Sequence, residues 1–136
     1  LQNKTPEALE NTMRLQKKIL ANLNQYSHYE FDDQKDAETL LVSYGISSRA
    51  VAEAALHLCE KGRKVSVLTV KTLLPVSDNI YDIIEKFKKV YVVEENLTGQ
   101  YRQILYGTRS PKHIKGINKI GKMISPKEIM EEVSNG

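Results

Sequence analysis

The stretch TLLVSYGISSRAVAEAALHLCEKGRKVSVLTV, residues 39–70, decides the fold. It opens with TLLVSYG (39–45), a short apolar run that ends in Gly and predicts a buried strand. Residues 47–62 predict a helix that starts with a Ser cap, carries small apolar residues on one face and ends at a Gly. KVSVLTV (64–70) is rich in β-branched residues and predicts a second strand. The stretch therefore predicts a strand–helix–strand unit.

The rest of the chain continues this alternation. The predicted elements that follow are a helix from Ser77 or Asp78 with Ile80, Ile83, Ile84 and Phe87 on one face, a strand over 90–93, a helix over 98–106, a more polar edge strand over 114–120, and a helix that begins at the capping box Ser125-Pro126-Lys127-Glu128. Short connections of this kind need right-handed crossovers between parallel strands. We therefore expect an α/β fold, a three-layer α/β/α sandwich with a mostly parallel sheet.

The first part of the chain follows a different pattern. Apolar residues at helical spacing, after a Thr-Pro-Glu start, predict an extra N-terminal helix over residues 6–24. Residues 24–36 are polar with embedded aromatic side chains, which leaves two alternatives, a linker or a short edge strand. We divide the chain into a leading helix and linker at 1–36 and one α/β domain at 37–136. Because the chain begins with Leu1, we expect a piece of a longer polypeptide.

Composition limits the class of protein. The 136 residues suffice for one domain with its own core, and 40% hydrophobic with 27% charged residues is ordinary for a globular protein. No apolar run approaches the roughly 20 residues that span a bilayer. Without a secretory signal, we expect a cytoplasmic protein with no membrane partner. The single Cys59 rules out an internal disulfide and a multi-cysteine metal or iron–sulfur site.

Ligands and partners of a parallel sheet bind outside the carboxyl ends of its strands. The candidate interface residues expected at or near that edge are Ser47, Ser48, Lys71, Glu94, Asn96 and Gln100. A dinucleotide site is excluded, because SYGISSR has one Gly where the phosphate-binding turn needs G-x-G-x-x-G. The start of the helix at Ser47 offers free amides to an anion, but so does every helix start.

The adjacent carboxylates of Glu94 and Glu95 raise the question of acid/base catalysis. Adjacent residues of an extended chain point to opposite faces, so we do not expect both to meet one substrate atom. Carboxylates ahead of a helix also complement its dipole, and this structural interpretation is favoured. Cys59 is expected to be packed, and the three histidines show no ligand spacing. We therefore predict no catalytic, cofactor-binding or metal-binding residue in this chain.

The charge is unevenly distributed, although the net value is only +3. There is no acidic residue from Asn96 through Lys127, and a candidate basic docking patch is formed by Arg109, Lys112, Lys115, Lys119 and Lys122. A solvated basic surface is the favoured interpretation. The alternative is a docking surface for an acidic protein or a phosphate-bearing ligand. Nucleic acid is not expected, because only Tyr101 and Tyr106 offer stacking faces there.

Five blocks of the sequence resemble one family. They are V-S-Y-G, A-V-x-E-A, G-x-K-V-x-V-L-x-V-K-T-L-L-P, V-Y-V-V-E-E-N-x-x-G-Q and I-x-K-I-G-K-x-I-S-P-K-E-I. Together they resemble the transketolase C-terminal-like domain, in the version found in the alpha subunit of 2-oxoacid:ferredoxin oxidoreductases, over roughly residues 37–134. The family often has one acid and a bulky apolar residue where this chain has Glu94-Glu95. This departure keeps the wider transketolase group open, including the beta subunits of 2-oxoacid dehydrogenases.

The resemblance implies a parent enzyme that decarboxylates a 2-oxoacid on thiamine diphosphate with Mg²⁺. Its electrons would pass through iron–sulfur clusters to ferredoxin, and its acyl group to coenzyme A. It further implies that other domains or the beta subunit hold these cofactors. This fragment would then be an architectural and interface element, inactive alone. Among the 2-oxoacids, 2-oxoglutarate is favoured over pyruvate and branched-chain acids.

The partners implied by the resemblance are the remaining domain of the alpha subunit, the beta subunit and ferredoxin. The leading helix fits the segment that links this domain to a pyrimidine-binding domain. Two alternatives stay open. One is a free-standing α/β binding module that docks an acidic protein or a phosphate ligand through residues 102–127, and the other is the equivalent domain of another thiamine-dependent enzyme.

Overall fold

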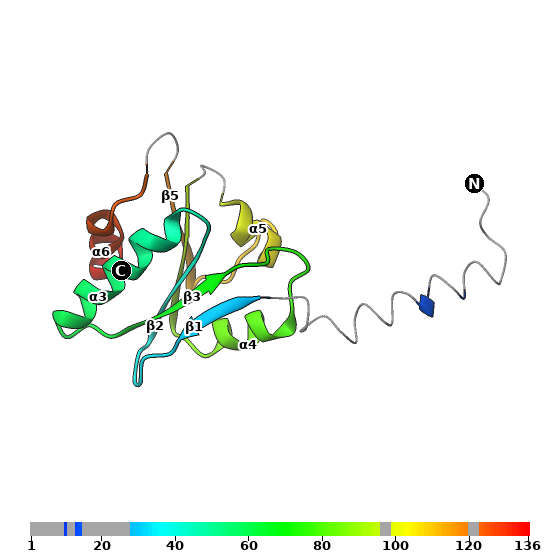
Figure 1. Ribbon diagram of the computed structural model, residues 1–136, viewed down its shortest axis with the longest axis horizontal. Coiled ribbons are helices and arrows are strands. Elements are labelled where there is room, and N and C mark those ends of the chain that lie inside the picture. The colour runs from blue at the N-terminus through cyan, green and yellow to red at the C-terminus, as the bar shows by residue number, and fades with distance from the viewer. Residues whose placement is uncertain (1–9, 11–12, 15–27, 96–98, 120–122) are drawn as a thin grey trace.

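One five-stranded sheet organises the computed structural model, which describes residues 10, 13–14, 28–95, 99–119 and 123–136. Its elements are β1 (Tyr29–Asp32), β2 (Thr39–Tyr44), α3 (Ser47–Glu60), β3 (Val65–Val70), α4 (Asp78–Glu85), β4 (Lys89–Glu94), α5 (Gln100–Tyr106), β5 (Ile114–Asn118) and α6 (Pro126–Asn135), shown in Figure 1. The strand order is β1-β3-β2-β4-β5. Only β1 runs antiparallel to its neighbour among these described strands, so the sheet is mostly parallel, as predicted.

Helices cover both faces of the sheet. α3 and α6 lie on one face, and α4 and α5 lie on the other (Figure 1). The central strand β2 contributes side chains to the cores on both faces of the sheet, because successive side chains of a strand point to opposite faces. Leu41 belongs to the core under α3 and α6, whereas Leu40 and Val42 belong to the core under α4 and α5. The predicted three-layer sandwich is confirmed.

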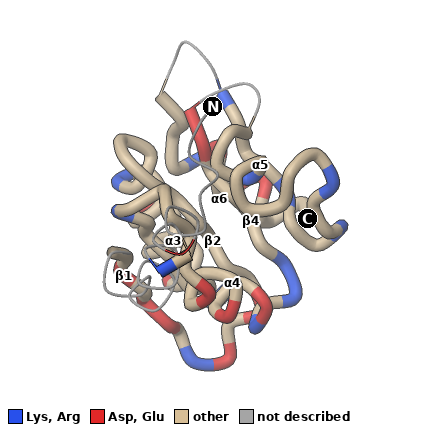
Figure 2. The backbone as a smooth tube through the Cα atoms, turned by 90° about the vertical axis from the view of Figure 1, so that its right-hand side faces the viewer, with Lys and Arg blue, Asp and Glu red and all other residues tan. Residues whose placement is uncertain are grey.

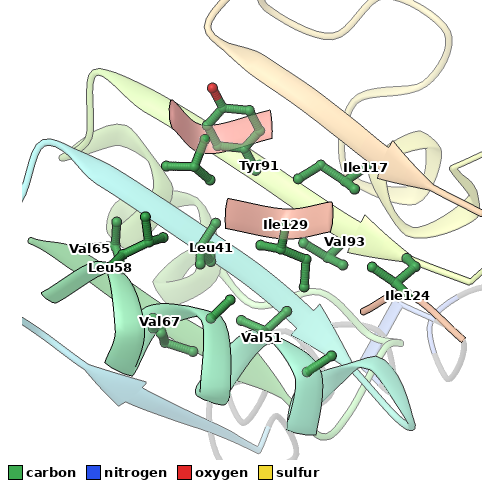
Figure 3. Close-up of a cluster of buried hydrophobic side chains, with 14 residues drawn as sticks. Leu41, Val51, Leu58, Val65, Val67, Tyr91, Val93, Ile117, Ile124 and Ile129 are labelled. Atoms are coloured by element: carbon green, nitrogen blue, oxygen red, sulfur yellow. The ribbon is translucent and has the colours of Figure 1, made fainter. Parts of the chain in front are cut away.

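The core under α3 and α6 explains the small residues in the predicted helix. Ala50 and Ala54 are buried against the sheet, and their size lets α3 lie close to it. From α6, Ile129 and Val133 enter the same cluster and are fully buried. Figure 3 shows this cluster between strands and helices, with Ile129 in its middle. Burial of each large aliphatic side chain stabilises the fold by about 1.5–3 kcal/mol.

The helix starts follow the sequence signals to different degrees. α6 begins as predicted, because the Glu128 N–H donates to the Ser125 hydroxyl (3.2 Å) and Pro126 occupies the first turn. The Ser cap predicted for α3 is wrong. Its N-cap residue is Ile46, which makes no side-chain cap hydrogen bond, because the Ser47 hydroxyl binds backbone carbonyl groups instead.

The structure decides between the two alternatives for the segment before β2, a linker or a short edge strand. Residues 29–32 form the edge strand, with Tyr29 opposite Val70 of β3. The sheet therefore includes residues that precede 37, where the sequence placed the start of the domain. The helix predicted over 6–24 lies outside the described residues, except for residues 10, 13 and 14, which are helical. In the described part of the chain, no helix is long and apolar enough to cross a membrane.

Candidate functional site

The carboxyl ends of the four parallel strands meet at one edge of the sheet, where the candidate site was predicted. β2 ends there at Tyr44, and β4 ends there at Glu94. The loop after β2 leads directly into α3 at Ser47. The structure therefore brings Glu94, Ser47 and Ser48 to one edge, as the sequence suggested.

The side chain of Glu94 is fully buried at the end of β4. Its Oε1 accepts hydrogen bonds from the Tyr44 hydroxyl (2.9 Å) and from the Tyr101 backbone N–H (2.5 Å). Its Oε2 accepts a third from the Arg102 backbone N–H (3.3 Å). A carboxylate is costly to bury unless hydrogen bonds replace its water. These donors come from β2 and α5, so one buried group joins three elements of the fold.

The Glu94 carboxylate takes the place of an N-cap for α5. The N-cap residue is Gly99, in the left-handed region at φ +66°, and it has no side chain to accept from the first turn. The N–H groups of Tyr101 and Arg102 belong to that turn and have no partner within the helix. Glu94 accepts both from the neighbouring strand, and its charge complements the helix dipole.

The serines at the start of α3 are tied into the sheet. The Ser47 hydroxyl donates to the Tyr44 carbonyl oxygen (2.9 Å), and the Val93 carbonyl oxygen lies 3.2 Å away. Ser47 is buried, and the Ser43 hydroxyl lies 3.3 Å from the Ser48 hydroxyl. These contacts hold the first turn of α3 against β2 and β4. The Ser47 hydroxyl therefore faces the interior of the domain.

Glu95 points away from Glu94, as the extended geometry predicted. Its Oε1 accepts a hydrogen bond from the Ile124 backbone N–H (3.3 Å), and Ile124 belongs to the core on the α3 side. Glu95 also lines a shallow hollow of about 250 Å³ together with Ile46 and Tyr44. The two carboxylates therefore serve opposite faces of the sheet and cannot act as an acid/base pair on one atom.

Four tyrosines pack beside Glu94 on the α4 and α5 face. Ring centroids are 5.6 Å apart for Tyr44 and Tyr101, and 5.7 Å apart for Tyr81 and Tyr106, both in edge-on geometry. Burial raises the pKa of Tyr101 well above its ordinary value, and it raises the pKa of Tyr106 to about 12. Both hydroxyls are therefore protonated at neutral pH and cannot serve as tyrosinate bases.

The other candidate interface residues do not join this network in one place. Lys71 follows β3 and forms an exposed ion pair with Glu30 of β1 (3.4 Å). Gln100 is exposed at the start of α5. Asn96 lies outside the described residues. The structure thus separates Lys71 from the buried Glu94 network.

The candidate basic docking patch is only partly assembled by the described residues. Arg109 and Lys112 are exposed in the loop before β5, and Lys115 is exposed on β5 itself. Lys119 is not a free cation, because its Nζ lies 2.5 Å from Glu128 Oε1. Lys122 lies outside the described residues. Figure 2 shows acidic and basic positions interspersed on the side of the molecule that it presents.

Cys59 and His57 both lie on α3, apart from the Glu94 network. No group of three His, Cys, Asp or Glu side chains in the described part of the chain could hold a metal ion. Cys59 is half-buried on α3. His57, on the surface of the same helix, lies 3.5 Å from Glu60 and 3.9 Å from Glu53. The polar groups of the carboxyl edge instead hold the domain together.

Sequence reasoning missed the surface that surrounds this network. Three large apolar side chains are exposed in loops that follow three of the four parallel strands: Ile46 after β2 (62% exposed), Leu74 after β3 (65%) and Met123 after β5 (61%). A signal was present, because each of these loops contains at least one large apolar residue beside polar, Gly or Pro residues. The contact of Tyr44 with Glu94 was missed as well, since it requires the strand order.

Comparisons with known proteins identify the class of this domain. The chain superposes on a split gene transketolase (inactive beta4 tetramer) with a TM-score of 0.59 and 18% identity, over 78% of this chain and 40% of that one, which shows the fold alone. Residues 37–129 match the family described as pyruvate:ferredoxin oxidoreductase core domain II. The chain belongs to this family.

Particular members of this class are more similar. The chain is 31% identical to the 2-oxoglutarate synthase subunit KorA of Methanocaldococcus jannaschii over 123 residues, which are 90% of this chain and 33% of that subunit. It also superposes on the 2-oxoglutarate:ferredoxin oxidoreductase from Magnetococcus marinus, solved with 2-oxoglutarate, coenzyme A and succinyl-CoA bound. The TM-score is 0.82 and the identity 26%, over 98% of this chain and 24% of that one. The predicted resemblance to an alpha-subunit domain is confirmed.

The Glu94 network can be tested with a matched pair of substitutions. We expect Glu94→Gln to lower the free energy of unfolding by about 1–3 kcal/mol, because an amide cannot accept from all three buried donors. Glu95→Gln removes the same charge from a half-buried group that accepts from the Ile124 N–H, and it is expected to cost less than about 1 kcal/mol. Urea unfolding gives both values, and amide exchange at Tyr101 and Arg102 should quicken only in Glu94→Gln. Equal losses for the two variants would contradict the role of Glu94.

The ion pair of Lys119 with Glu128 predicts a pH dependence. The hydrogen bond from Lys119 holds the pKa of the Glu128 carboxyl below its ordinary value. A carboxyl whose pKa is lowered on folding stabilises the fold above its unfolded pKa, and this contribution is lost as the pH falls through the lowered value. We expect Lys119→Ala to raise the pKa of Glu128 in an NMR titration. Lys115→Ala is the control, and an unchanged Glu128 pKa in Lys119→Ala would refute the pairing.

Proposed function

We propose that this chain is an architectural and subunit-interface domain of the alpha subunit of a 2-oxoacid:ferredoxin oxidoreductase. The single observation that carries this proposal is the arrangement of polar and apolar side chains at the carboxyl edge. The carboxylates and serines there bind within the domain, whereas Ile46, Leu74 and Met123 point large apolar side chains outward. Such an edge offers an apolar surface to a neighbouring protein.

The apolar side chains support an interface because they share one edge. Parallel strands place the loops that follow them on the same side of the sheet, so the loops of Ile46, Leu74 and Met123 open in the same direction. Single exposed apolar residues are ordinary on protein surfaces, whereas a group of them marks a contact with another protein. The hollow beside Ile46 and Glu95 gives that contact a place for a side chain.

The proposed parent enzyme oxidatively decarboxylates a 2-oxoacid to an acyl-coenzyme A and passes two electrons to ferredoxin. The substrate that the relatives favour is 2-oxoglutarate, which is named in both KorA of M. jannaschii and the M. marinus enzyme. Pyruvate, named in the family description, and branched-chain acids are the other substrates of this class. We place the enzyme in the cytoplasm.

Thiamine diphosphate, Mg²⁺ and iron–sulfur clusters are proposed to be held elsewhere in the parent enzyme. The chain has one cysteine, too few for an iron–sulfur cluster. The described residues contain no group of acidic, histidine or cysteine side chains fitted to a metal ion. The described residues therefore do not fit a metal ion or an iron–sulfur cluster, and we assign this domain no chemical step. Its partners would be the remaining domain of the alpha subunit and the beta subunit.

A second role, contact with ferredoxin, is favoured by one observation. Arg109, Lys112 and Lys115 are exposed within seven residues of sequence, and they form no ion pair among the described residues. Such a cluster attracts an acidic protein over a distance set by the ionic strength. This role belongs to the same parent enzyme and does not require a free-standing module, which the comparisons do not support.

The interface is tested in the complete oxidoreductase. We expect Ile46→Glu combined with Met123→Glu to weaken association of the alpha subunit with its partners by roughly tenfold or more, because a charge must be buried at each position. Ile104→Glu, also exposed but on α5, is the control and should assemble normally. Sedimentation velocity measures assembly, and reduction of ferredoxin by 2-oxoglutarate with coenzyme A measures activity. Normal assembly of the double variant, or tight thiamine diphosphate binding to this chain alone in calorimetry, would overturn the proposal.

The ferredoxin contact is tested by charge reversal. We expect Lys112→Glu with Lys115→Glu to raise the KM for ferredoxin by roughly threefold to tenfold at low salt, because steering depends on these charges. The effect should shrink as salt is added, while the KM for the 2-oxoacid stays unchanged. Lys64→Glu, exposed just before β3, is the control. A KM for ferredoxin that is independent of both charge and salt would reject this role.

A further inference from the structure

The side chain of Arg102 is a half-buried cation at the carboxyl edge of the sheet. It extends from the first turn of α5, and the Arg102 backbone N–H donates to the Glu94 carboxylate. The guanidinium itself forms no ion pair within the described part of the chain. A guanidinium carries several N–H donors and keeps its charge in proteins. The described residues therefore hold a cation at this edge and give it no counter-ion.

Two glycines make room for this guanidinium. Gly116 lies on β5, and a Cβ at that position would come within 3.2 Å of Arg102 Cζ. A Cβ on Gly99 would lie 3.4 Å from Arg102 Nη2. Gly116 shares a face of β5 with Ile114, which belongs to the core under α4 and α5. The Arg102 side chain therefore packs across β5 on the face that α5 covers, and this close approach fixes the place of its guanidinium.

The side chain of Asn118 brings an amide to the same place. Asn118 ends β5 and stands opposite Glu94 in the register of the sheet. A Cβ on Gly116 would lie 3.0 Å from Asn118 Nδ2 and 3.2 Å from Arg102 Cζ, so the two donor groups are neighbours. The Asn118 Oδ1 is buried and has no hydrogen-bond partner among the described residues, so no contact of this oxygen accounts for the amide. A guanidinium beside an amide NH₂ is a donor set suited to an oxyanion.

The charge and the position of this pair favour a carboxylate of a neighbouring protein. One guanidinium with a neutral amide matches the single negative charge of a carboxylate, and a planar guanidinium can donate to both of its oxygens. β5 ends at Asn118, so the pair lies at the same edge as the exposed Ile46 and Met123. A protein that docks there removes water from Arg102, which is strongly unfavourable unless an anion arrives with it. This chain supplies no such anion nearby in sequence, because residues 96–127 contain no Asp or Glu.

We propose that Arg102 and Asn118 bind an Asp or Glu side chain of the protein that packs on the carboxyl edge. This inference rests on the proposed function, since that neighbour belongs to the assembled oxidoreductase. The Arg102 guanidinium donates to both oxygens of the partner carboxylate, and Asn118 Nδ2 donates to one of them. Within an interface from which water is excluded, such a charged pair fixes how the two proteins are oriented, and an arginine in this position dominates the affinity.

Arginine reactivity in the complete enzyme tests the contact. Phenylglyoxal modifies accessible guanidinium groups, and peptide mass spectrometry measures the rate at Arg102. We expect this rate to be at least roughly tenfold lower in the assembled enzyme than in the separated alpha subunit, because the partner covers the group. Inorganic phosphate and coenzyme A should give no protection in the separated subunit. Equal rates in the two states, or protection of Arg102 by either small anion, would overturn the proposal.

Charge reversal tests the sign of the partner group. We expect Arg102→Glu to weaken association roughly tenfold or more in sedimentation velocity, because two carboxylates then face each other. The matched control is Arg63→Glu, since Arg63 is also half-buried and without an ion pair among the described residues, but lies before β3 at the opposite edge. Gly116→Ala keeps Arg102 and crowds its guanidinium, so it should also weaken association. Normal association of Arg102→Glu, or an equal loss in Arg63→Glu, would refute the role of Arg102.

A photocrosslinker followed by charge exchange identifies the partner group. With p-benzoylphenylalanine in place of Arg102, at subunit concentrations above the weakened dissociation constant, we expect a crosslink to a segment of the neighbouring protein that carries Asp or Glu. Replacement of that acid by Arg should restore association of the Arg102→Glu variant. A crosslinked segment without an acidic residue, or an exchange that restores nothing, would contradict the proposal.

The experiments separate this inference from the proposed function. Assembly of the unmodified enzyme is scored independently by sedimentation. If the enzyme assembles and Arg102 reacts as fast as in the separated subunit, the inference is wrong, while the proposed function stands. If the chain carrying this domain enters no oxidoreductase complex, the proposed function itself is wrong.

Discussion

The buried carboxylate of Glu94 is the constraint on which the carboxyl edge of this domain depends. A carboxylate buried at the end of a strand must find donors, and here they come from Tyr44 of β2 and from the first turn of α5. The same bonds start α5, which has Gly99 where a capping side chain would stand. The Glu94 carboxylate therefore links β4, β2 and α5. This link lies at the edge of the sheet where ligands bind in related folds.

This use of polar groups decides what the edge can do. Ser47 is likewise turned to carbonyl groups of the sheet, and the pKa of Tyr101 is raised beyond the range in which it could act as a base. Side chains of types that serve catalysis in other α/β proteins form hydrogen bonds within the domain here. What faces outward is apolar, and an apolar surface is stabilised by contact with another protein and not by a small polar substrate. This supports the assembly role that we propose for the edge.

Local sequence patterns were sufficient to predict most of the strands and helices and the three-layer architecture. β-branched runs, the Ile spacing of α4 and the capping box at Ser125 act over a few residues, and each was read correctly. The contact between Tyr44 and Glu94 spans 50 residues and depends on β2 lying next to β4, which no local pattern encodes. The Ser cap predicted for α3 is wrong because the Ser47 hydroxyl donates to the Tyr44 carbonyl three residues earlier, with the Val93 carbonyl of the neighbouring strand also within reach. The points that local reasoning missed therefore have both local and long-range causes.

The strand order also separates the charges of the domain. It places β1, with Glu30 and Asp32, at one edge of the sheet and β5, with Lys115, at the other. Charges on short edge strands oppose the pairing of like edges, which is how sheets avoid adding further copies. Opposite charges on the two edges do not oppose head-to-tail contact, so another feature has to block it. The short length of β1, four residues, limits such pairing at the acidic edge.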